Sequence, residues 1–141
     1  MHPDALTDFR VLIQPVVDRA DATDKEAATG LMLMFDGVET VAQLRKLDDG
    51  TFFTSFYKGL TSLQPEIADA VRGAEITMLG SVMEGNDTAH VVYRLISSIN
   101  TSLSEAQVVT VQRTKNGWGV LLTSEMTTMT ENISRAMDAQ H

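Results

Sequence analysis

The chain has 141 residues, no cysteine, a formal net charge of -8 at pH 7 and a pI near 4.7. Without cysteine it cannot form a disulfide, a thiolate nucleophile or a cysteine-ligated metal centre. Nucleic acid and anionic membrane surfaces are both negatively charged, so the acidic balance predicts neither as a partner.

The N-terminus and the hydropathy pattern bear on location. The first four residues, Met1 to Asp4, contain neither the basic region nor the apolar run of a signal peptide. No uncharged apolar stretch reaches the length of about 18 residues that a membrane span needs. These features predict a cytoplasmic protein with no membrane association. A chain from which a leader had been removed would read the same, so export is the alternative.

The first half of the chain has the periodicity of helices. Apolar residues recur at steps of three and four over residues 6–20, and Pro15 predicts a kink or a restart of the helix there. The sequence Asp21 to Asp24 breaks this pattern, and Thr23 with Glu26 fits a capping box that opens a second helix to about Phe35. Further helices are predicted over residues 38–47, 50–63 and 65–73.

After Gly73 the period changes from that of a helix to that of a strand. Strands are predicted over residues 74–84, 88–99, 105–113 and 118–123. Clusters of glycine, asparagine and aspartate at 84–87 and of lysine, asparagine and glycine at 115–117 predict tight turns, which force neighbouring strands to pair antiparallel. A last helix is predicted over about 125–139.

These elements predict one α+β domain over residues 1–141, since no linker, repeat or low-complexity tract divides the chain. Helices occupy about residues 5–72, a four-stranded antiparallel sheet about 74–123, and a terminal helix the rest.

The strand over 88–99 carries three candidate ligand-binding residues. Alternation places His90 and Arg94 on one face of this strand and Tyr93 on the other. If the first face lines a concave sheet, His90 and Arg94 can hold an anion or polarise a carbonyl group. If that face is in solvent, both are ordinary surface residues, and Tyr93 is a core residue with its hydroxyl at the rim.

The helix over 50–63 supplies a fourth candidate, Tyr57. Four of the eight aromatic residues of the chain lie within residues 52–57, and core packing is the simpler role for such a stripe. A pocket beside this helix would nevertheless expose the Tyr57 hydroxyl as a hydrogen-bond donor. The three histidines show no H-x-x-x-H or E-x-x-H spacing, so we assign no metal ligand, no cofactor and no catalytic residue.

Several blocks of sequence resemble one superfamily. They are LGSVMEG at 79–85, AHVVYR at 89–94, GWGVLL at 117–122 and, upstream, FFTSFY at 52–57. They look like blocks of uncharacterised bacterial proteins that are similar to the nuclear transport factor 2-like (cystatin-like, ketosteroid-isomerase-like) superfamily. The resemblance covers about residues 5–125. It implies a cone in which helices pack on a curved sheet around a cavity, and homodimers formed through the outer face of the sheet.

Three functions compete. A non-catalytic domain that binds a small apolar ligand is indicated by the aromatic helix and the eight methionines. A small isomerase, dehydratase or cyclase requires His90 or an acid to meet Tyr57 or Tyr93 in one pocket. A protein-interaction module that dimerises through its sheet would expose apolar side chains on the strand over 105–113. Ligand binding or protein interaction is the favoured hypothesis, because no acid is firmly placed for catalysis.

Overall fold

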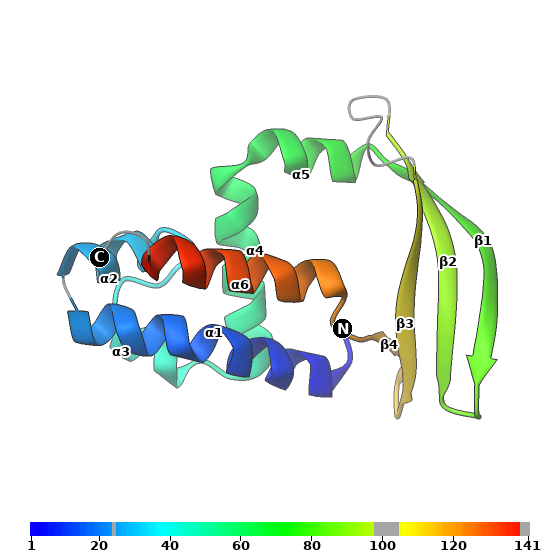
Figure 1. The fold of residues 1–141 in the computed structure, drawn as a ribbon, viewed down its shortest axis with the longest axis horizontal. Coiled ribbons are helices and arrows are strands. Elements are labelled where there is room, and N and C mark those ends of the chain that lie inside the picture. Colours follow the sequence, from blue (N-terminus) through cyan, green and yellow to red (C-terminus); the bar gives the residue numbers. More distant parts are fainter. Residues whose placement is uncertain (24, 98–104, 139–141) are drawn as a thin grey trace. The chain divides into compact units, whose positions relative to one another are not determined.

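The computed structural model describes residues 1–23, 25–97 and 105–138, and within these ranges the fold is α+β (Figure 1). Five helices of the described chain precede an antiparallel sheet of four strands, and one helix follows it, which confirms the predicted class and order. The helices are α1 (Pro3–Thr23), α2 (Lys25–Met32), α3 (Val41–Lys46), α4 (Asp49–Leu63), α5 (Pro65–Arg72) and α6 (Ser124–Asp138). The strands are β1 (Glu75–Glu84), β2 (Thr88–Ile96), β3 (Ala106–Thr114) and β4 (Gly117–Val120).

Three helices differ from the prediction. α3 begins at Val41 rather than at residue 38, because the Thr40 hydroxyl accepts from the Gln43 N–H and caps the helix there. α1 does not restart at Pro15, and it continues through the predicted break to Thr23. A proline removes one backbone hydrogen bond, but the apolar side chains on both sides of it are buried, and their packing holds the helix together. α2 ends at Met32 rather than near Phe35. The predicted capping box rests on the side chain of Thr23, which lies outside the described side chains.

The chain forms two compact units. The helical unit comprises Pro3–Leu63 and Ser124–His141, and the sheet unit comprises Met1–His2 and Gln64–Thr123. α1 is central to the helical unit, where it contacts α2, α4 and α6.

Aromatic rings form the core of the helical unit. Phe9 of α1 is fully buried, and its ring centroid lies 5.1 Å from those of both Phe53 and Phe56 of α4. Phe35 follows α2 and lies 5.1 Å from Phe52 and 5.4 Å from Phe56, also on α4. The stripe of aromatic residues predicted on this helix is therefore core packing for three of its four rings and joins three segments of the chain.

A glycine allows the segment after α2 to approach α4 closely. A Cβ atom at Gly59 would lie 2.3 Å from the carbonyl oxygen of Met34, so only glycine fits this contact. One turn earlier on α4, the Ser55 hydroxyl donates to the carbonyl of Asp36 at 2.6 Å, and the Asp36 N–H donates to the carbonyl of Ser55 at 2.9 Å. These bonds give partners to both the N–H and the carbonyl of Asp36, which lies outside any helix or strand.

The side chain of Arg10 on α1 forms hydrogen bonds to the C-terminal end of α3. Its guanidinium donates to the carbonyl oxygens of Leu47 and, at 2.9 Å, Arg45. It also pairs with the Asp49 carboxylate at 3.2 Å and lies 5.0 Å above the ring of Phe52. The positive charge of Arg10 thus interacts with the last carbonyl groups of α3 and with the first turn of α4. A cation at a helix C-terminus is stabilising in this way.

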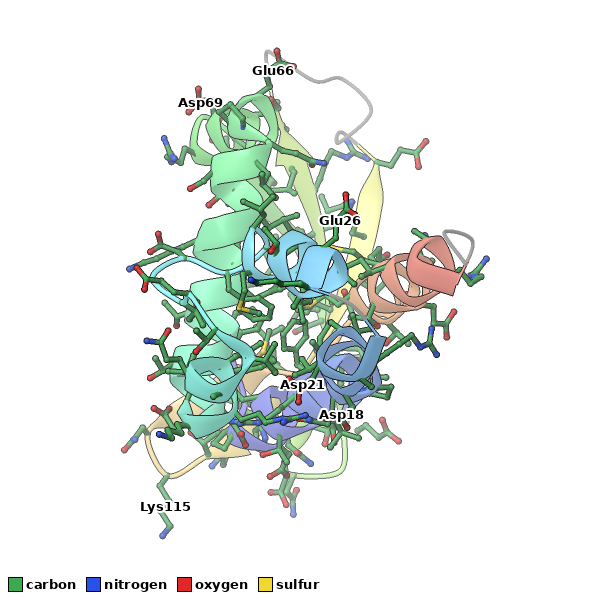
Figure 2. The ribbon with its side chains drawn as sticks, turned by 90° about the vertical axis from the view of Figure 1, so that its left-hand side faces the viewer. Asp18, Asp21, Glu26, Glu66, Asp69 and Lys115 are labelled. Atoms are coloured by element: carbon green, nitrogen blue, oxygen red, sulfur yellow. The ribbon has the colours of Figure 1, made fainter. Side chains whose placement is uncertain are left out.

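An ion-pair network lies on the exposed side of α1. Asp18 and Asp21 are one turn apart on this helix (Figure 2), and Arg45 donates to them at 3.0 Å and 2.7 Å. A hydrogen bond from Gln14, followed by that from Arg45, lowers the pKa of Asp18 below 3.8. The same pairing raises the pKa of Arg45.

The strands of the sheet unit are hydrogen-bonded in the order β1-β2-β3-β4, and all pairs are antiparallel. Gly85 and Gly117 have φ values of 66° and 121° in the two predicted turns, a region that other residues seldom adopt. The N-terminus lies along β4, where the His2 N–H donates to the carbonyl of Val120 at 2.8 Å. A Cβ at Gly119 would come within 2.8 Å of His2 Cα, so this glycine leaves room for the N-terminal residues.

Candidate functional site

The most open part of the sheet unit is its edge strand β1. All ten of its residues are exposed, although they point alternately to both faces of the sheet. The exposed fractions of its apolar side chains reach 69% for Ile76 and Met78 and 66% for Val82. Large contiguous apolar patches are rare on the surfaces of soluble monomers, so the exposed apolar side chains of β1 make this strand the candidate site.

Strand register sorts the side chains onto two faces, because residues directly opposite each other share a face. The Tyr93 face is mainly apolar and carries Ile76, Met78, Ser81, Met83, Ala89, Val91, Tyr93, Leu95, Gln107, Val109, Val111, Arg113, Trp118 and Val120. The His90 face is mainly polar and carries Glu75, Thr77, Val82, Glu84, Thr88, His90, Val92, Arg94, Ile96, Ala106, Val108, Thr110, Gln112 and Thr114. A bulge between Met78 and Gly80 makes Leu79 the extra residue of β1.

His90 joins three strands on the polar face. Its Nδ1 lies 3.0 Å from the hydroxyl of Thr110 on β3, and its Nε2 lies 2.7 Å from the carboxylate of Glu84 on β1. If the imidazole is neutral and Nε2–H donates to Glu84, then Nδ1 accepts the Thr110 proton. A hydroxyl, an imidazole and a carboxylate in a row are the components of an activated nucleophile. In this chain the same contacts also link β2, which carries His90, to β3 and to β1.

Tyr93 and Arg94 do not join this cluster. The Tyr93 hydroxyl donates to Gln107 Oε1 at 2.8 Å on the opposite face, where the two residues are directly paired. Arg94 lies on the His90 face opposite Thr77 and Ala106, and it is exposed. The predicted separation of His90 and Arg94 from Tyr93 is therefore confirmed. His90 and Tyr93 point to opposite faces of the sheet and cannot contact the same substrate, so this pair is removed from the enzyme hypothesis.

Tyr57 belongs to the helical unit. Its ring stacks on that of Phe53, with centroids 6.4 Å apart and an interplanar angle of 18°, and 52% of the residue is exposed. It is the one ring of the predicted stripe that faces solvent. Its role in binding a small apolar ligand stays a prediction.

Sequence reasoning missed two features of the sheet. The first is the contact of Glu84 with His90, which the predicted turn over 84–87 could have signalled. The second is the ring of Trp118, whose centroid lies 5.1 Å from the Arg113 guanidinium directly opposite it on the Tyr93 face. A cation over an indole ring is a favourable pair, and it adds an exposed aromatic group to the apolar face.

Other kinds of site find no support in the described parts of the chain. No group of three or more histidine, aspartate or glutamate side chains converges there as a metal site would require. Among those residues, no helix is both long and apolar enough to cross a membrane.

Comparison of the chain with family models, with curated proteins and with solved structures finds no match.

Proposed function

We propose that this chain is a non-catalytic interaction domain that binds a second copy of itself through the sheet unit. The observation that carries the proposal is the complete exposure of β1, with Ile76, Met78 and Val82 each about two-thirds in solvent. Val108 on β3 is 60% exposed, which is the feature expected of an interaction module on that strand. Covering such side chains gives about 25 cal/mol for each Å² removed from water.

Membership of the nuclear transport factor 2-like superfamily is part of the same proposal. The α+β class, with helices followed by an antiparallel sheet, supports it, whereas the closing helix is a departure from the usual order of the superfamily. The resemblance implies homodimers through the sheet, and a second copy is the simplest partner because closed two-fold dimers are the commonest assemblies of soluble proteins.

Sedimentation velocity over a range of concentrations tests this function. We expect the sedimentation coefficient to rise with concentration as monomers associate. The variant Val82→Lys should stay monomeric at concentrations where the parent chain associates, because a lysine on an edge strand opposes pairing. A parent chain that stays monomeric up to millimolar concentration would exclude self-association.

A matched control is available in the helical unit. Val11 on α1 is 65% exposed and Val82 is 66% exposed, so the two valines differ in location and hardly in burial. Val11→Lys adds the same charge at an exposed helical position and should leave association unchanged. If both variants weaken association equally, the added charge and not the sheet is responsible.

A further inference from the structure

We propose that β1 pairs edge to edge and antiparallel with β1 of the second copy, which joins two four-stranded sheets into one of eight strands. This deepens the function proposed above and rests on it. The two edges of the sheet differ in a way that selects β1. β4 has only four residues and the N-terminal residues lie along it, whereas β1 has ten residues and no strand of the described chain on its outer side.

The edge of β1 lacks the features that normally prevent pairing. Natural edge strands carry lysine, proline or a charge in their middle, or are very short. The only charged residues of β1 are Glu75 and Glu84 at its two ends, and the strand contains neither lysine nor proline. The bulge at Leu79 is the one protective device present, and it has a second consequence for pairing.

The bulge makes β1 complementary to itself. Four residues precede Leu79 and Gly80, and four follow them, so a two-fold axis at this point pairs the two halves. Ile76 then lies opposite Met83 of the second copy, and Thr77 lies opposite Val82. Ile76 and Met83 share the Tyr93 face, and Thr77 and Val82 share the His90 face.

This agreement of faces depends on the extra residue. In a regular strand, positions 76 and 83 are an odd number of residues apart and point to opposite faces. The bulge shifts the second half by one residue and returns both positions to the same face. Moving the register by one residue would set apolar positions of one copy against the polar face of the other, so a shift by one residue is disfavoured.

The area and the charges set the strength of this dimer. Ten residues a side is fewer than the roughly 20–30 of a stable interface, so we expect a dissociation constant on the order of micromolar or weaker. The register also brings Glu75 opposite Glu84 of the second copy. Glu84 is partly compensated by His90 Nε2 at 2.7 Å, and Glu75 has Ile96 as its neighbour on β2. Neutralising the repulsion with Glu75→Gln should tighten association by about two- to tenfold.

Introduced cysteines test the register, because the chain has none of its own. Chains carrying Ile76→Cys are mixed with chains carrying Met83→Cys and oxidised gently, and the products are identified by mass spectrometry. We expect a disulfide dimer in the mixture and none in either variant alone. Two copies of residue 76 would lie roughly 20 Å apart along the paired strands, beyond the reach of a disulfide.

A second pair, Thr77→Cys with Val82→Cys, lies on the other face. Opposed residues alternate between hydrogen-bonded and closer non-hydrogen-bonded pairs, so one of the two pairs has the spacing that favours a disulfide. Val11→Cys mixed with Ile76→Cys is the control for random collision and should not cross-link. Circular dichroism of each variant checks that it is folded.

The outcomes separate this proposal from the function on which it rests. Association of the parent chain without a mixed disulfide in either pair overturns edge pairing and leaves dimerisation through the sheet standing. Self-linking of Ile76→Cys as fast as the mixed reaction also overturns the register. A parent chain that is monomeric at every concentration overturns both.

Discussion

The helical unit and the sheet unit bury their apolar residues very differently. The largest fully buried side chains, those of Phe9, Phe52, Ile13, Leu44 and Val17, all belong to the helical unit. In the strands of the sheet unit, Ala89 is the one apolar residue of the described chain that is buried. The helical unit therefore buries large apolar side chains, whereas the buried apolar side chains described in the sheet unit are the small ones of Ala68, Ala70 and Ala89.

The difference shows that the apolar content of a segment does not decide whether its side chains are buried. β1 contains Ile76, Met78, Leu79, Val82 and Met83, as apolar a segment as α4, but a strand buries its side chains only when a layer covers its face. An antiparallel sheet gains little from the hydrophobic effect where its apolar side chains stay in solvent, as those of β1 do. This is the physical reason to expect that the sheet unit associates.

The largest effect should follow from removing a ring of the helical core. Phe9→Ala leaves a cavity among Phe52, Phe53 and Phe56 and should lower the free energy of unfolding by about 3–5 kcal/mol, measured by urea denaturation. Ile76→Ala is the comparison in the sheet unit, where the residue is 69% exposed, and it should cost less than about 0.5 kcal/mol in dilute solution. Equal losses would mean that β1 is buried and would remove the contrast between the units.

Two glycine substitutions compare a crowded position and an open position within the helical unit. Gly59→Ala places a Cβ against the backbone of Met34 and Phe35 and should destabilise the protein by about 1–3 kcal/mol. Gly30→Ala in α2 meets no atom within 4 Å and should stabilise it by about 0.5–1 kcal/mol, because alanine favours the helix. Thermal unfolding of the two variants should shift in opposite directions. Stabilisation by Gly59→Ala would show that α4 and the segment after α2 are not in close contact.

Replacing Arg10 and replacing Arg72 should give a third and smaller difference in stability between the two units. Arg10→Met removes hydrogen bonds to Leu47, Arg45 and Asp49 from a side chain that is only 20% exposed, and it should cost about 1–3 kcal/mol in urea denaturation. Arg72→Met in the sheet unit removes a pair with Asp69 from a side chain that is 75% exposed. Its effect should be within about 0.5 kcal/mol, since exposed pairs are screened by water.

Most of the fold could be predicted because its signals are local. The change of period after Gly73, the turn glycines Gly85 and Gly117, and the alternation along β2 each depend on residues adjacent in sequence. Of the two outcomes predicted at Pro15, a kink or a restart, the restart does not occur, because the burial of both flanking halves outweighs one lost hydrogen bond, and burial is not a local property.

The candidate surface could be predicted only in part. Alternation separated His90 from Tyr93, but it could not identify Thr110 as the partner of His90, because that pairing depends on the register of β3. The bulge at Leu79 has no strong signal apart from the glycine after it. Exposure of β1 was also beyond prediction, since the same apolar pattern fits a strand covered by another layer.

The smallest effect concerns the N-terminus of α4 and its dependence on pH. The Asp48 carboxylate accepts from the Thr51 hydroxyl at 2.6 Å and from the Thr51 N–H at 3.0 Å, and these hydrogen bonds, the hydroxyl first, lower its pKa below 3.8. The unfolded chain therefore takes up this proton at a higher pH than the folded chain. Stability from Asp48 is complete above its unfolded pKa and is lost as the pH falls through the lower, folded pKa.

Asp48→Asn isolates this contribution, because asparagine also caps helices but does not titrate. We expect the urea midpoint of the parent chain to fall more steeply than that of the variant between about pH 5 and about pH 2. Asp18, whose pKa is also lowered, titrates in both proteins and so does not contribute to the difference. Parallel midpoints across this range would mean that Asp48 is not held by Thr51 in the folded state. A steeper fall in the parent chain would locate part of the acid sensitivity at the start of the aromatic helix, within the unit that carries the core.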